Sequence, residues 1–475
     1  MDAAVVAITE KKPHVICVPI PAQSHLLAML KLAALLHHMG LQVTFVNTET
    51  IHKQLLESGG VRSLDGLSDF RFETVPDGVP SGSEDDETTF LTPFLDLVAT
   101  KLPTPPTCII SDGFMSLFTI DAAKKLGIPV MLYWTLAACG FMGFYHNQSL
   151  IDKGLTPLKD ESYLTNGYLE TIVDWIPGME GIRLKDLNTL PWTTDPDNEL
   201  LKICTKATQK CHDVSHNIIH TFDALEASIV DALSFICPRI YTVGPLQLLL
   251  SQIPLEGKQS TMLHFKGYNL RKEEPECIQW LQSKEPNSVI YVNFGSTTKM
   301  PLNDLIEFAW GLVDSNHYFL WIIRSDLVVG ESSANFSPEL EELIEKRGYI
   351  ASWCSQEKVL NHPSVGGFLT HCGWGSTIES LSAGVPMICW PYLWDQVTNC
   401  RYTCKEWEVG LEMGKDVKRE EVCKLVQELM GENGHRMRIK AIEWREKALT
   451  ATGPNGSSSS NINSLVEEIT VWSRN

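Results

Sequence analysis

The segment 370–380, THCGWGSTIES, brings a histidine, small hydroxyl residues and a glutamate together around a glycine turn. The apolar run SVGGFLTHC before it predicts a buried strand, and the run STIESLSAG after it predicts a helix. Gly375 and Ser376 then lie at a helix N-terminus, where free N–H groups and the helix dipole stabilise a phosphate. His371 is placed to donate to the same anion, and Glu379 to accept hydrogen bonds from a pair of sugar hydroxyls. An ordinary capped turn explains these residues without a ligand, so the segment alone leaves both interpretations open.

A second chemically capable pair, His25 and Asp112, stands in the N-terminal half of the chain. His25 opens a helix-like segment after the apolar run HVICVPIP, while Asp112 ends the run TCIISD. In open α/β sheets the loops beyond the carboxyl ends of strands hold the ligand, so both side chains are expected at that edge. A histidine backed by a carboxylate is a general base held in one tautomer. A lone histidine is more often structural, and no G-x-S-x-G nucleophile motif accompanies the pair.

The elements that position these residues alternate between short apolar runs and helical patterns, which predicts an α/β chain. One series runs from HVICVPIP to IPVMLYWT and a long apolar helix through AACGFMGFYH, and a second runs from SVIYVNFGS to VPMICWP. We predict two doubly wound, Rossmann-like domains that face each other across a cleft. The segment GPNGSSSSN at 453–461 is expected to be a flexible hinge. The expected divisions are 1–247 for the N-terminal domain, 248–276 for a polar linker, 277–455 for the C-terminal domain, and 456–475 for a last helix able to pack back on the N-terminal domain.

Composition limits the kinds of partner. The 475 residues are 44% hydrophobic and 20% charged, as in a globular protein, and no run approaches the roughly 18 to 20 apolar residues of a membrane span. A net charge of −19 disfavours nucleic acid and anionic membranes as partners. The N-terminus has no basic region ahead of an apolar stretch, so we expect an unprocessed, cytoplasmic protein, and we expect it to be a monomer.

The cysteine pattern and the glycine motifs argue against a metal and against a redox cofactor. Thirteen cysteines are an odd number, and many lie in apolar runs such as HVICV, which favours buried thiols over disulfides. H-E-x-x-H and paired C-x-x-C motifs are missing, and Cys400 and Cys404 have no second pair, so no metal site is expected. VPIPAQSH stands where G-x-G-x-x-G would follow the first strand, so a nicotinamide oxidoreductase is poorly supported. A non-catalytic binder of sugar nucleotides or terpenoids would need a broken His25–Asp112 pair, and both residues are present.

The 44 positions from Trp353 to Gln396 resemble the signature box of the plant family 1 UDP-dependent glycosyltransferases, which act on secondary products. The similarity extends over essentially the whole chain, through strings such as PAQSH, SDGF, YWTLAACGFMGFYH and SKEPNSVIYVNFGSTT, and is closest to the diterpenoid branch. The resemblance implies a GT-B fold with the UDP-sugar on the C-terminal domain and the acceptor on the N-terminal domain. It also implies inverting transfer without a metal ion and without any cofactor beyond the co-substrate UDP-glucose.

Carried over by position, the resemblance gives Trp353 a stacking role on uracil. Asp395 and Gln396 would bind hydroxyls of glucose; the alternative is that Gln396 only caps a turn and that Trp374 or domain closure selects the sugar. Gly375 departs from the family pattern, which usually has Asn there, and so removes an amide donor to phosphate. The donor-binding residues implied by the resemblance are Thr135, Ser296, Trp353, Cys354, Gln356, His371, Trp374, Gly375, Ser376, Glu379, Asp395 and Gln396.

Catalysis and acceptor binding are expected on the N-terminal domain. His25 would deprotonate the acceptor hydroxyl while Asp112 steadies the imidazolium. The resemblance implies a small hydrophobic acceptor of the steviol diterpenoid type, with a flavonoid or another phenol as the alternative. Apolar loops supply its candidate lining, although helix core explains several of these residues equally well: Phe141, Met142, Phe144, Tyr145, Met179 and Trp192.

Overall fold

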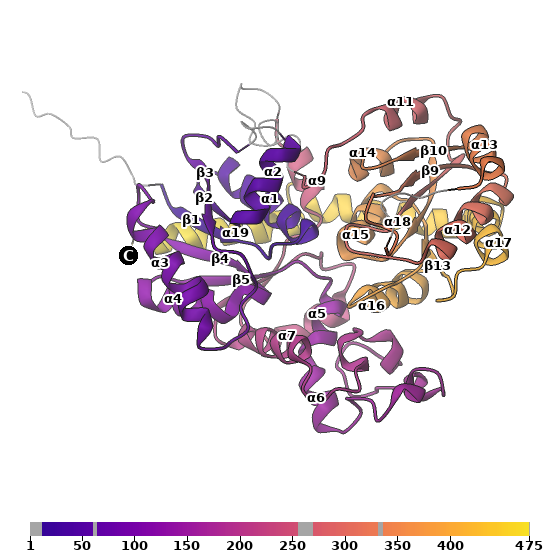
Figure 1. The fold of residues 1–475 in the computed structure, drawn as a ribbon. Coiled ribbons are helices and arrows are strands. Elements are labelled where there is room, and N and C mark those ends of the chain that lie inside the picture. Colours follow the sequence, from indigo (N-terminus) through magenta and orange to yellow (C-terminus); the bar gives the residue numbers. More distant parts are fainter. Residues whose placement is uncertain (1–11, 60–63, 255–268, 331–335, 475) are drawn as a thin grey trace, which may run out of the picture.

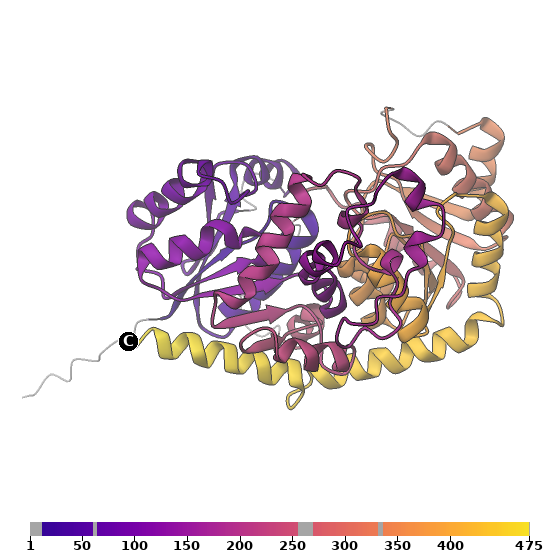
Figure 2. The ribbon, with the colours of Figure 1, turned by 90° about the horizontal axis from the view of Figure 1, so that it is seen from below.

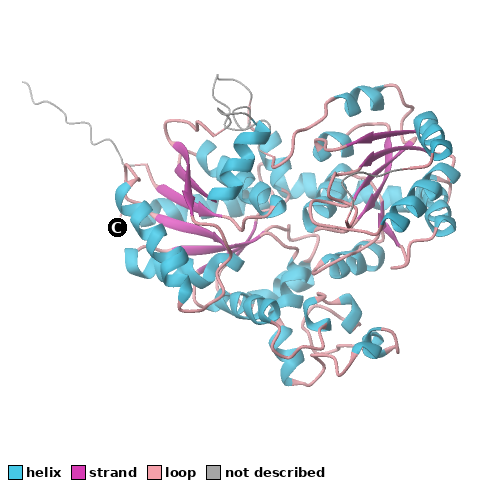
Figure 3. Cartoon of the chain, in the orientation of Figure 1, coloured by secondary structure: helices cyan, strands magenta, loops and turns pink. Residues whose placement is uncertain are grey.

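The computed structural model describes residues 12–59, 64–254, 269–330 and 336–474. Two α/β lobes stand side by side, and in each lobe helices cover both faces of a central sheet (Figure 1, Figure 3). All strand pairs of both sheets are parallel. The predicted pair of doubly wound, Rossmann-like domains is confirmed.

The N-terminal sheet has the strand order β3-β2-β1-β4-β5-β6-β7. Its strands are β1 (His14–Val18), β2 (Gln42–Thr48), β3 (Phe70–Val75), β4 (Cys108–Asp112), β5 (Val130–Trp134), β6 (His216–Ile219) and β7 (Ile240–Thr242). The α-helices of this lobe are α1 (Gln23–His38), α2 (Glu49–Gly59), α3 (Thr92–Thr100), α4 (Ser116–Leu126), α5 (Ala138–Tyr145), α6 (Asn147–Asp152), α7 (Glu199–Gln209), α8 (Ala227–Ser234) and α9 (Leu246–Ser251).

The C-terminal sheet has the order β10-β9-β8-β11-β12-β13. Its strands are β8 (Val289–Asn293), β9 (Tyr318–Ile322), β10 (Gly348–Ala351), β11 (Val365–Thr370), β12 (Met387–Cys389) and β13 (Gly410–Glu412). The α-helices that follow the linker are α11 (Glu276–Gln282), α12 (Leu302–Asp314), α13 (Pro338–Arg347), α14 (Gln356–Leu360), α15 (Trp374–Ala383), α16 (Gln396–Arg401), α17 (Arg419–Met430), α18 (Gly434–Thr452) and α19 (Ser457–Trp472).

The strand order reverses direction once in each sheet, between β1 and β4 and between β8 and β11. The central strands are covered on both faces and are therefore continuous apolar runs; all five residues of β1 are buried. Loops on the two sides of a reversal diverge, which opens a crevice at the carboxyl ends of the strands. Each lobe therefore has one switch point at which a ligand can bind.

The last two helices join the lobes. Figure 2 shows α18 and α19 running along one side of both lobes. The predicted hinge at 453–461 is wrong in its second half, because α19 already begins at Ser457. The serines are held in place: Ser458 Oγ donates to the Gly244 carbonyl at 2.6 Å, and Ser459 Oγ donates to the Thr452 carbonyl at 2.7 Å. The last helix thus packs on the N-terminal lobe, beside β7.

Two further segments differ from their predicted form. The long apolar helix expected through AACGFMGFYH is only eight residues long, since α5 ends at Tyr145 and α6 begins at Asn147. Of the predicted linker, residues 255–268 lie outside the described residues, while α9 covers its start and α11 begins at its end. Among the helices that the structure describes, none combines the length and the apolar character needed to cross a bilayer.

Candidate active site

His25 and Asp112 meet at the switch point of the N-terminal lobe. His25 is the third residue of α1, Asp112 is the last residue of β4, and Nδ1 of the ring lies 2.7 Å from Oδ2 of the carboxylate. Because a carboxylate only accepts, Nδ1 carries the proton and Nε2 keeps a free lone pair. No described residue forms a hydrogen bond with Nε2, and the ring remains 14% exposed. Thr135, implied by the resemblance to lie near the sugar, places its Oγ1 2.8 Å from the same Nδ1 and so also contacts the ring.

The charge around His25 favours its protonated form. Burial lowers the pKa of His25, but the charge of Asp112, the hydrogen bond to it and the charge of Asp395 outweigh burial and raise the pKa above its ordinary value of 6.5. Asp395 belongs to the other lobe and packs against α5, where a Cβ on Gly140 would lie 3.3 Å from Asp395 Cβ. Burial raises the pKa of Asp395. A carboxylate that the resemblance assigns to the sugar therefore lies within electrostatic reach of the candidate base.

His371, directly after β11, stands at the second switch point and is enclosed by two glycines. A Cβ on Gly373 would lie 2.6 Å from the ring, and a Cβ on Gly295 would overlap it. Burial, followed by the charge of Arg324, lowers the pKa of His371 to about 4, so the ring is neutral. Its Nδ1 is buried and has no partner among the described residues. A buried polar atom without a partner is costly, and a ligand oxygen or N–H would relieve that cost.

The helix that follows begins two residues before Ser376, the first residue of the predicted helix. α15 starts at Trp374 with Gly373 as its N-cap residue, so the N–H groups of its first turn have no helical partners. A Cβ on Gly375 would meet no atom within 4 Å. The position at which the family usually has Asn therefore has open space in front of it, and steric crowding does not require glycine there.

Glu379 lies in a hydrogen-bond network that spans the two lobes. Its Oε2 accepts from Gln356 Nε2 at 3.0 Å, and the same amide nitrogen lies 3.0 Å from Ser376 Oγ. Its Oε1 accepts from Lys31 Nζ of α1 at 2.9 Å, with both side chains 15% exposed. Burial lowers the pKa of Lys31, but the charges of Glu379 and Glu357 raise it further, so the lysine is cationic. A carboxylate has about four lone-pair positions, so two remain for ribose hydroxyls.

A cavity of about 850 Å³ opens between the lobes, within the usual size range of ligand sites. Its wall includes Gln23, two residues before His25, and from the other lobe Ser296 and Trp353. The guanidinium of Arg271 lies 5.8 Å from the centre of the Trp353 ring. Cys354, by contrast, places its thiol 3.4 Å from the buried Tyr291 hydroxyl, so its side chain faces the protein core.

Two signature-box side chains already have protein partners. Trp374 donates its indole N–H to the His220 carbonyl of the N-terminal lobe at 2.7 Å. Gln396 uses Oε1 to accept from the backbone N–H groups of Tyr392 and Leu393, both at 2.9 Å. The oxygen of Gln396 therefore caps a turn, as the alternative interpretation expects. Its Nε2 has no hydrogen-bond partner in the described part of the chain. Asp395 Oδ2 accepts from Asn399 Nδ2 at 2.9 Å.

Comparison with known proteins matches residues 212–442 to the UDP-glucoronosyl and UDP-glucosyl transferase family model and residues 12–76 to a glycosyltransferase N-terminal domain model. UDP-glycosyltransferase 85C2 of Stevia rebaudiana is 69% identical over 486 residues, which cover 100% of each chain. The chain belongs to the plant UDP-glycosyltransferase family. The 7-deoxyloganetin glucosyltransferase of Catharanthus roseus is 52% identical over 96% of each chain.

Membership makes this protein a UDP-dependent glycosyltransferase, as predicted. A crystal structure of a UDP-glucose: anthocyanidin 3-O-glucosyltransferase in complex with UDP matches with a TM-score of 0.79 and 25% identity over 97% of this chain and 100% of that chain. The predicted GT-B fold is confirmed by this similarity and by the two facing sheets.

Three residues of the predicted acceptor lining of the glycosyltransferase are buried in the structure. Phe141 and Met142 are 0% exposed and Met179 is 1% exposed, which favours the alternative that they belong to the core. The apolar face of α5 packs inward on Trp134, whose ring centre lies 4.6 Å from that of Phe141. The other three candidates are also engaged: Phe144 is buried beside Phe114, the Tyr145 hydroxyl lies 2.9 Å from His212 Nε2, and the Trp192 indole donates to the Leu184 carbonyl.

Three residues that the sequence interpretation missed lie close to the candidate site residues. Half-buried Phe114 stands edge-on to His25, with ring centres 6.4 Å apart, and is therefore an aromatic side chain beside the candidate base. Arg324 is 3% exposed and donates to the carbonyls of Gly295 and Thr298, behind the loop that carries Ser296. Phe114 and Arg324 follow strand ends, so the rule used for Asp112 applies to both. Lys31 gave no such signal, because its partners come from the other lobe.

Cys400 and Cys404 have no second pair at a metal-binding spacing in the sequence, but the fold brings two other cysteines close to Cys400. Cys372 and Cys389, distant in sequence, place their Sγ atoms within 4.8 Å of that of Cys400 and of each other. A spacing search along the chain cannot detect such a group, because each cysteine comes from a different element.

Proposed function

We propose that this glycosyltransferase moves glucose from UDP-glucose, with inversion, to a hydroxyl of a small hydrophobic acceptor, a diterpenoid of the steviol type. The observation that carries the proposal is the His25–Asp112 pair at 2.7 Å, with Nε2 of the ring free. This pair lies on one lobe. His371, whose Nδ1 has no partner among the described residues, and Glu379 lie on the other lobe. Each lobe thus supplies one half of a transfer site.

His25 acts as the general base in this proposal. An aliphatic alcohol has a pKa far above neutrality, so its proton must leave as the new bond forms, a contribution typically worth 10² to 10⁴-fold in rate. Nε2 accepts that proton, and the buried Asp112, 1% exposed, stabilises the imidazolium that results. Phe114, edge-on to the ring, covers one side of the space in which the alcohol would lie.

The leaving diphosphate is stabilised by groups of the C-terminal lobe. The free N–H groups at the start of α15 point at the switch point, and the positive end of the helix dipole favours an anion there. His371 contributes a neutral ring rather than a charge, because its pKa is lowered to about 4. Arg324 supplies a buried positive charge behind the Ser296 loop. We propose that these fixed groups stabilise the charge that develops on the diphosphate without a metal ion.

We propose inversion because the two lobes carry different parts of the site. The proposed base belongs to α1, and the proposed anion-binding groups lie after β11 and at the start of α15, an arrangement that lets the attacking oxygen approach from the side opposite the leaving oxygen. The charge of Asp395 contributes to the raised pKa of His25, and this carboxylate is proposed to accept from a glucose hydroxyl. The free Nε2 of Gln396 is proposed to donate to a neighbouring hydroxyl.

Support for the finer assignments comes from the relatives and from the resemblance. Glucose is supported by relatives named as glucosyltransferases. The diterpenoid acceptor rests on the sequence strings that resemble the diterpenoid branch and on a relative of 69% identity from Stevia rebaudiana. A flavonoid or another phenol is the alternative acceptor, and another relative is named for 7-deoxyloganetin.

An acceptor panel tests the proposal. Purified protein is incubated with UDP-glucose or UDP-galactose and with steviol, a flavonol and a simple phenol, and products are identified by mass spectrometry. We expect glucosylated steviol and at least a tenfold preference for UDP-glucose, since an axial hydroxyl leaves a polar group unpaired at about 1–3 kcal/mol. Reaction of the phenols alone would overturn the diterpenoid assignment and leave the donor assignment intact.

A further inference from the structure

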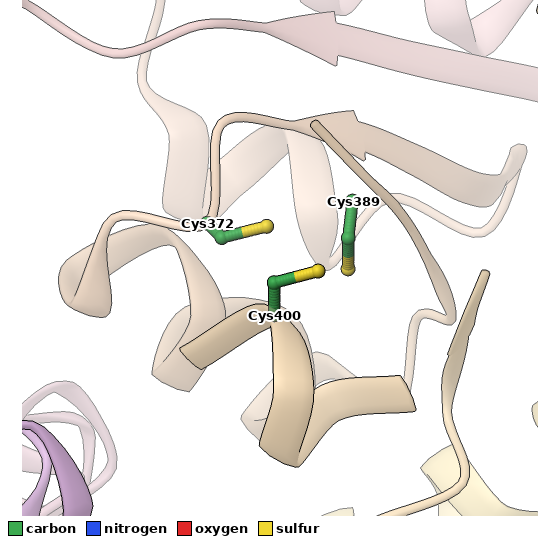
Figure 4. Close-up of side chains that lie close together, drawn as sticks. All are labelled: Cys372, Cys389 and Cys400. Atoms are coloured by element: carbon green, nitrogen blue, oxygen red, sulfur yellow. The ribbon is translucent and has the colours of Figure 1, made fainter. Parts of the chain in front are cut away.

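Three cysteines of the C-terminal lobe gather at a point that the proposed chemistry does not use. Cys372 follows β11, Cys389 ends β12 and Cys400 lies in α16, yet their Sγ atoms all lie within 4.8 Å of one another. Figure 4 shows the three thiol groups pointing toward a common space from separate elements. The residues are 1%, 0% and 2% exposed, and none forms a disulfide.

We propose that Cys372, Cys389 and Cys400 bind one Cu⁺ ion as a three-coordinate thiolate centre, and that the bound ion slows glycosyl transfer. Soft thiolate ligands select Cu⁺ or Zn²⁺ among the common metal ions. A metal–sulfur distance of about 2.3 Å in a planar centre places the sulfur atoms about 4 Å apart, so the triangle closes by less than about 1 Å on binding. Structural Zn²⁺ requires four ligands, whereas the mutually close group contains three. The thiols release their protons to solvent, and the copper stays Cu⁺, so no oxidant or reductant is needed.

Cys404 gives the buried group a connection to solvent. It lies in the π-helical turn Tyr402–Glu406 and is partly exposed. Its thiol affects the pKa values of Cys389 and Cys400 but is not among the three mutually close sulfur atoms. An ion that first meets Cys404 can therefore pass inward to the other three. Single π-helical turns occur frequently at functional sites, which agrees with such a role.

The metal centre would act on transfer through the backbone. Cys372 directly follows His371 and has φ of +63°, a left-handed conformation that an L residue adopts at a cost. Asn399, the neighbour of Cys400, donates its Nδ2 to the Cys372 carbonyl at 3.0 Å and to Asp395 Oδ2 at 2.9 Å. Drawing the three sulfur atoms together therefore shifts the segments that carry His371 and Asp395. This inhibitory consequence, unlike the binding of copper, rests on the roles proposed above for His371 and Asp395.

Binding is tested on the full chain, reduced and purified without metal. Cu⁺ is titrated in the presence of a coloured Cu⁺ chelator as competitor, with thiolate-to-copper absorption in the ultraviolet as the second readout. We expect one tightly held Cu⁺ in the wild type and none in Cys389→Ala or Cys400→Ser. Cys423→Ala, at a partly exposed cysteine on α17, is the matched control and should keep the ion. Thermal melting shows which variants are folded. If only one of Cys389→Ala and Cys400→Ser is folded, that variant alone decides the outcome.

Retention of one Cu⁺ by both folded variants would overturn the site, and so would binding of Zn²⁺ at a concentration at which Cu⁺ does not bind. For the inhibitory step, kcat/KM is measured with and without one equivalent of Cu⁺. We expect at least a tenfold loss in the wild type, restored by the chelator, and no loss in Cys389→Ala. Equal inhibition of wild type and Cys389→Ala would place the effect elsewhere. Bound copper with unchanged kcat/KM would refute the inhibitory step and leave the metal site standing. Failure of the acceptor panel would leave the copper-binding result unaffected, because that result is measured without an acceptor.

Discussion

Replacing Asp112 by Asn removes the negative charge beside His25 but keeps the size and shape of the side chain. The side chain keeps its size and still reaches Nδ1, now 2.7 Å from Oδ2, but the negative charge is lost. An amide can also turn its N–H₂ toward the ring, which would place the ring proton on Nε2 and remove the free lone pair. We therefore expect Asp112→Asn to reduce the turnover of an aliphatic alcohol strongly while leaving UDP binding, on the other lobe, unchanged.

The magnitude follows from the charge that His25 acquires during transfer. At about 4 Å between charge centres and an effective dielectric constant near 20, a carboxylate stabilises an imidazolium by ~4 kcal/mol, or about 10³-fold in rate. The 14% exposure of His25 admits some solvent screening, so a loss of about 10² to 10³-fold in kcat/KM is expected. A phenol gives up its proton more easily, so its loss should be smaller, about tenfold.

The pH profile supplies a second test of the same pair. His25 accepts a proton only when neutral, and Asp112 raises its pKa above 6.5, so wild-type kcat/KM should fall as the pH drops through that raised value. Asn removes the charge that favours imidazolium, so the acid limb should move to lower pH even as the plateau falls. A purely structural role of Asp112 would lower the plateau without moving the limb.

Initial rates with a diterpenoid alcohol and with a phenol, taken between about pH 5 and 9, measure both effects. Asp121→Asn is the matched control, because Asp121 lies on the exposed face of α4 in a pair with Lys124 and its charge is remote from the ring. Quenching of tryptophan fluorescence by UDP reports whether the donor lobe is intact. An Asp112→Asn enzyme that turns over the alcohol within about threefold of wild type, with the same acid limb, would refute the assignment of the base pair.

Three further changes probe the proposed donor site. Gln396→Glu keeps the oxygen that caps the turn but loses the free amide donor, so we expect at least a tenfold loss of glucose transfer with unchanged UDP affinity; wild-type rates would limit Gln396 to the turn. Gly375→Asn fills open space with an amide and should tighten UDP binding by about tenfold, whereas Gly375→Ala, the control for helix propensity, should only raise the free energy of unfolding by about 0.5–1 kcal/mol. Lys31→Met removes the cation paired with Glu379 and should weaken UDP binding, measured by fluorescence titration, by about tenfold, whereas Lys31→Arg should retain it.

The fold was predictable from the sequence because parallel sheets covered on both faces leave a strong pattern. Strands such as HVICV read as unbroken apolar runs, and the residues that follow them, such as His25, fall at the carboxyl edge by topology alone. The His25–Asp112 pair could be placed for the same reason, since β1 and β4 flank a reversal of strand order. The aromatic side chains of α5 turn inward because they pack against Trp134. The hydrophobic pattern of the sequence does not show whether such side chains face the core or a ligand.

The site features that the sequence did not predict depend on contacts between segments far apart in the chain. Lys31 donates a hydrogen bond to Glu379, 348 positions away in the chain, and the residues around either one give no sign of this contact. The three cysteines of the group come from three different elements. The side-chain oxygen of Gln396 accepts a hydrogen bond within its own turn, whereas its side-chain nitrogen has no partner in the described part of the chain. The pKa of His371, too, depends on burial and on Arg324 rather than on its neighbours in the signature box. Such properties arise only once the lobes are assembled.

The signature box can be understood as a docking surface as much as a ligand site. Within and just beyond it, Trp374 donates to the His220 carbonyl at 2.7 Å, Trp407 donates to the Leu225 carbonyl at 3.2 Å, and the backbone N–H of Trp394 donates to Thr189 Oγ1 at 2.7 Å. All three donors belong to the C-terminal lobe and all three acceptors to the N-terminal lobe, so these bonds fix how the lobes sit relative to each other. Transfer requires the attacking oxygen at about 3–3.5 Å from the anomeric carbon, and a displacement of about 1 Å lowers the reaction rate by about 10²-fold. Because the proposed base and the proposed diphosphate site are on different lobes, that distance is set by the interface and not by either lobe alone. The tryptophans in and just beyond the signature box therefore have a structural reason: the segment proposed to hold the donor also fixes its position relative to the lobe that carries the proposed base.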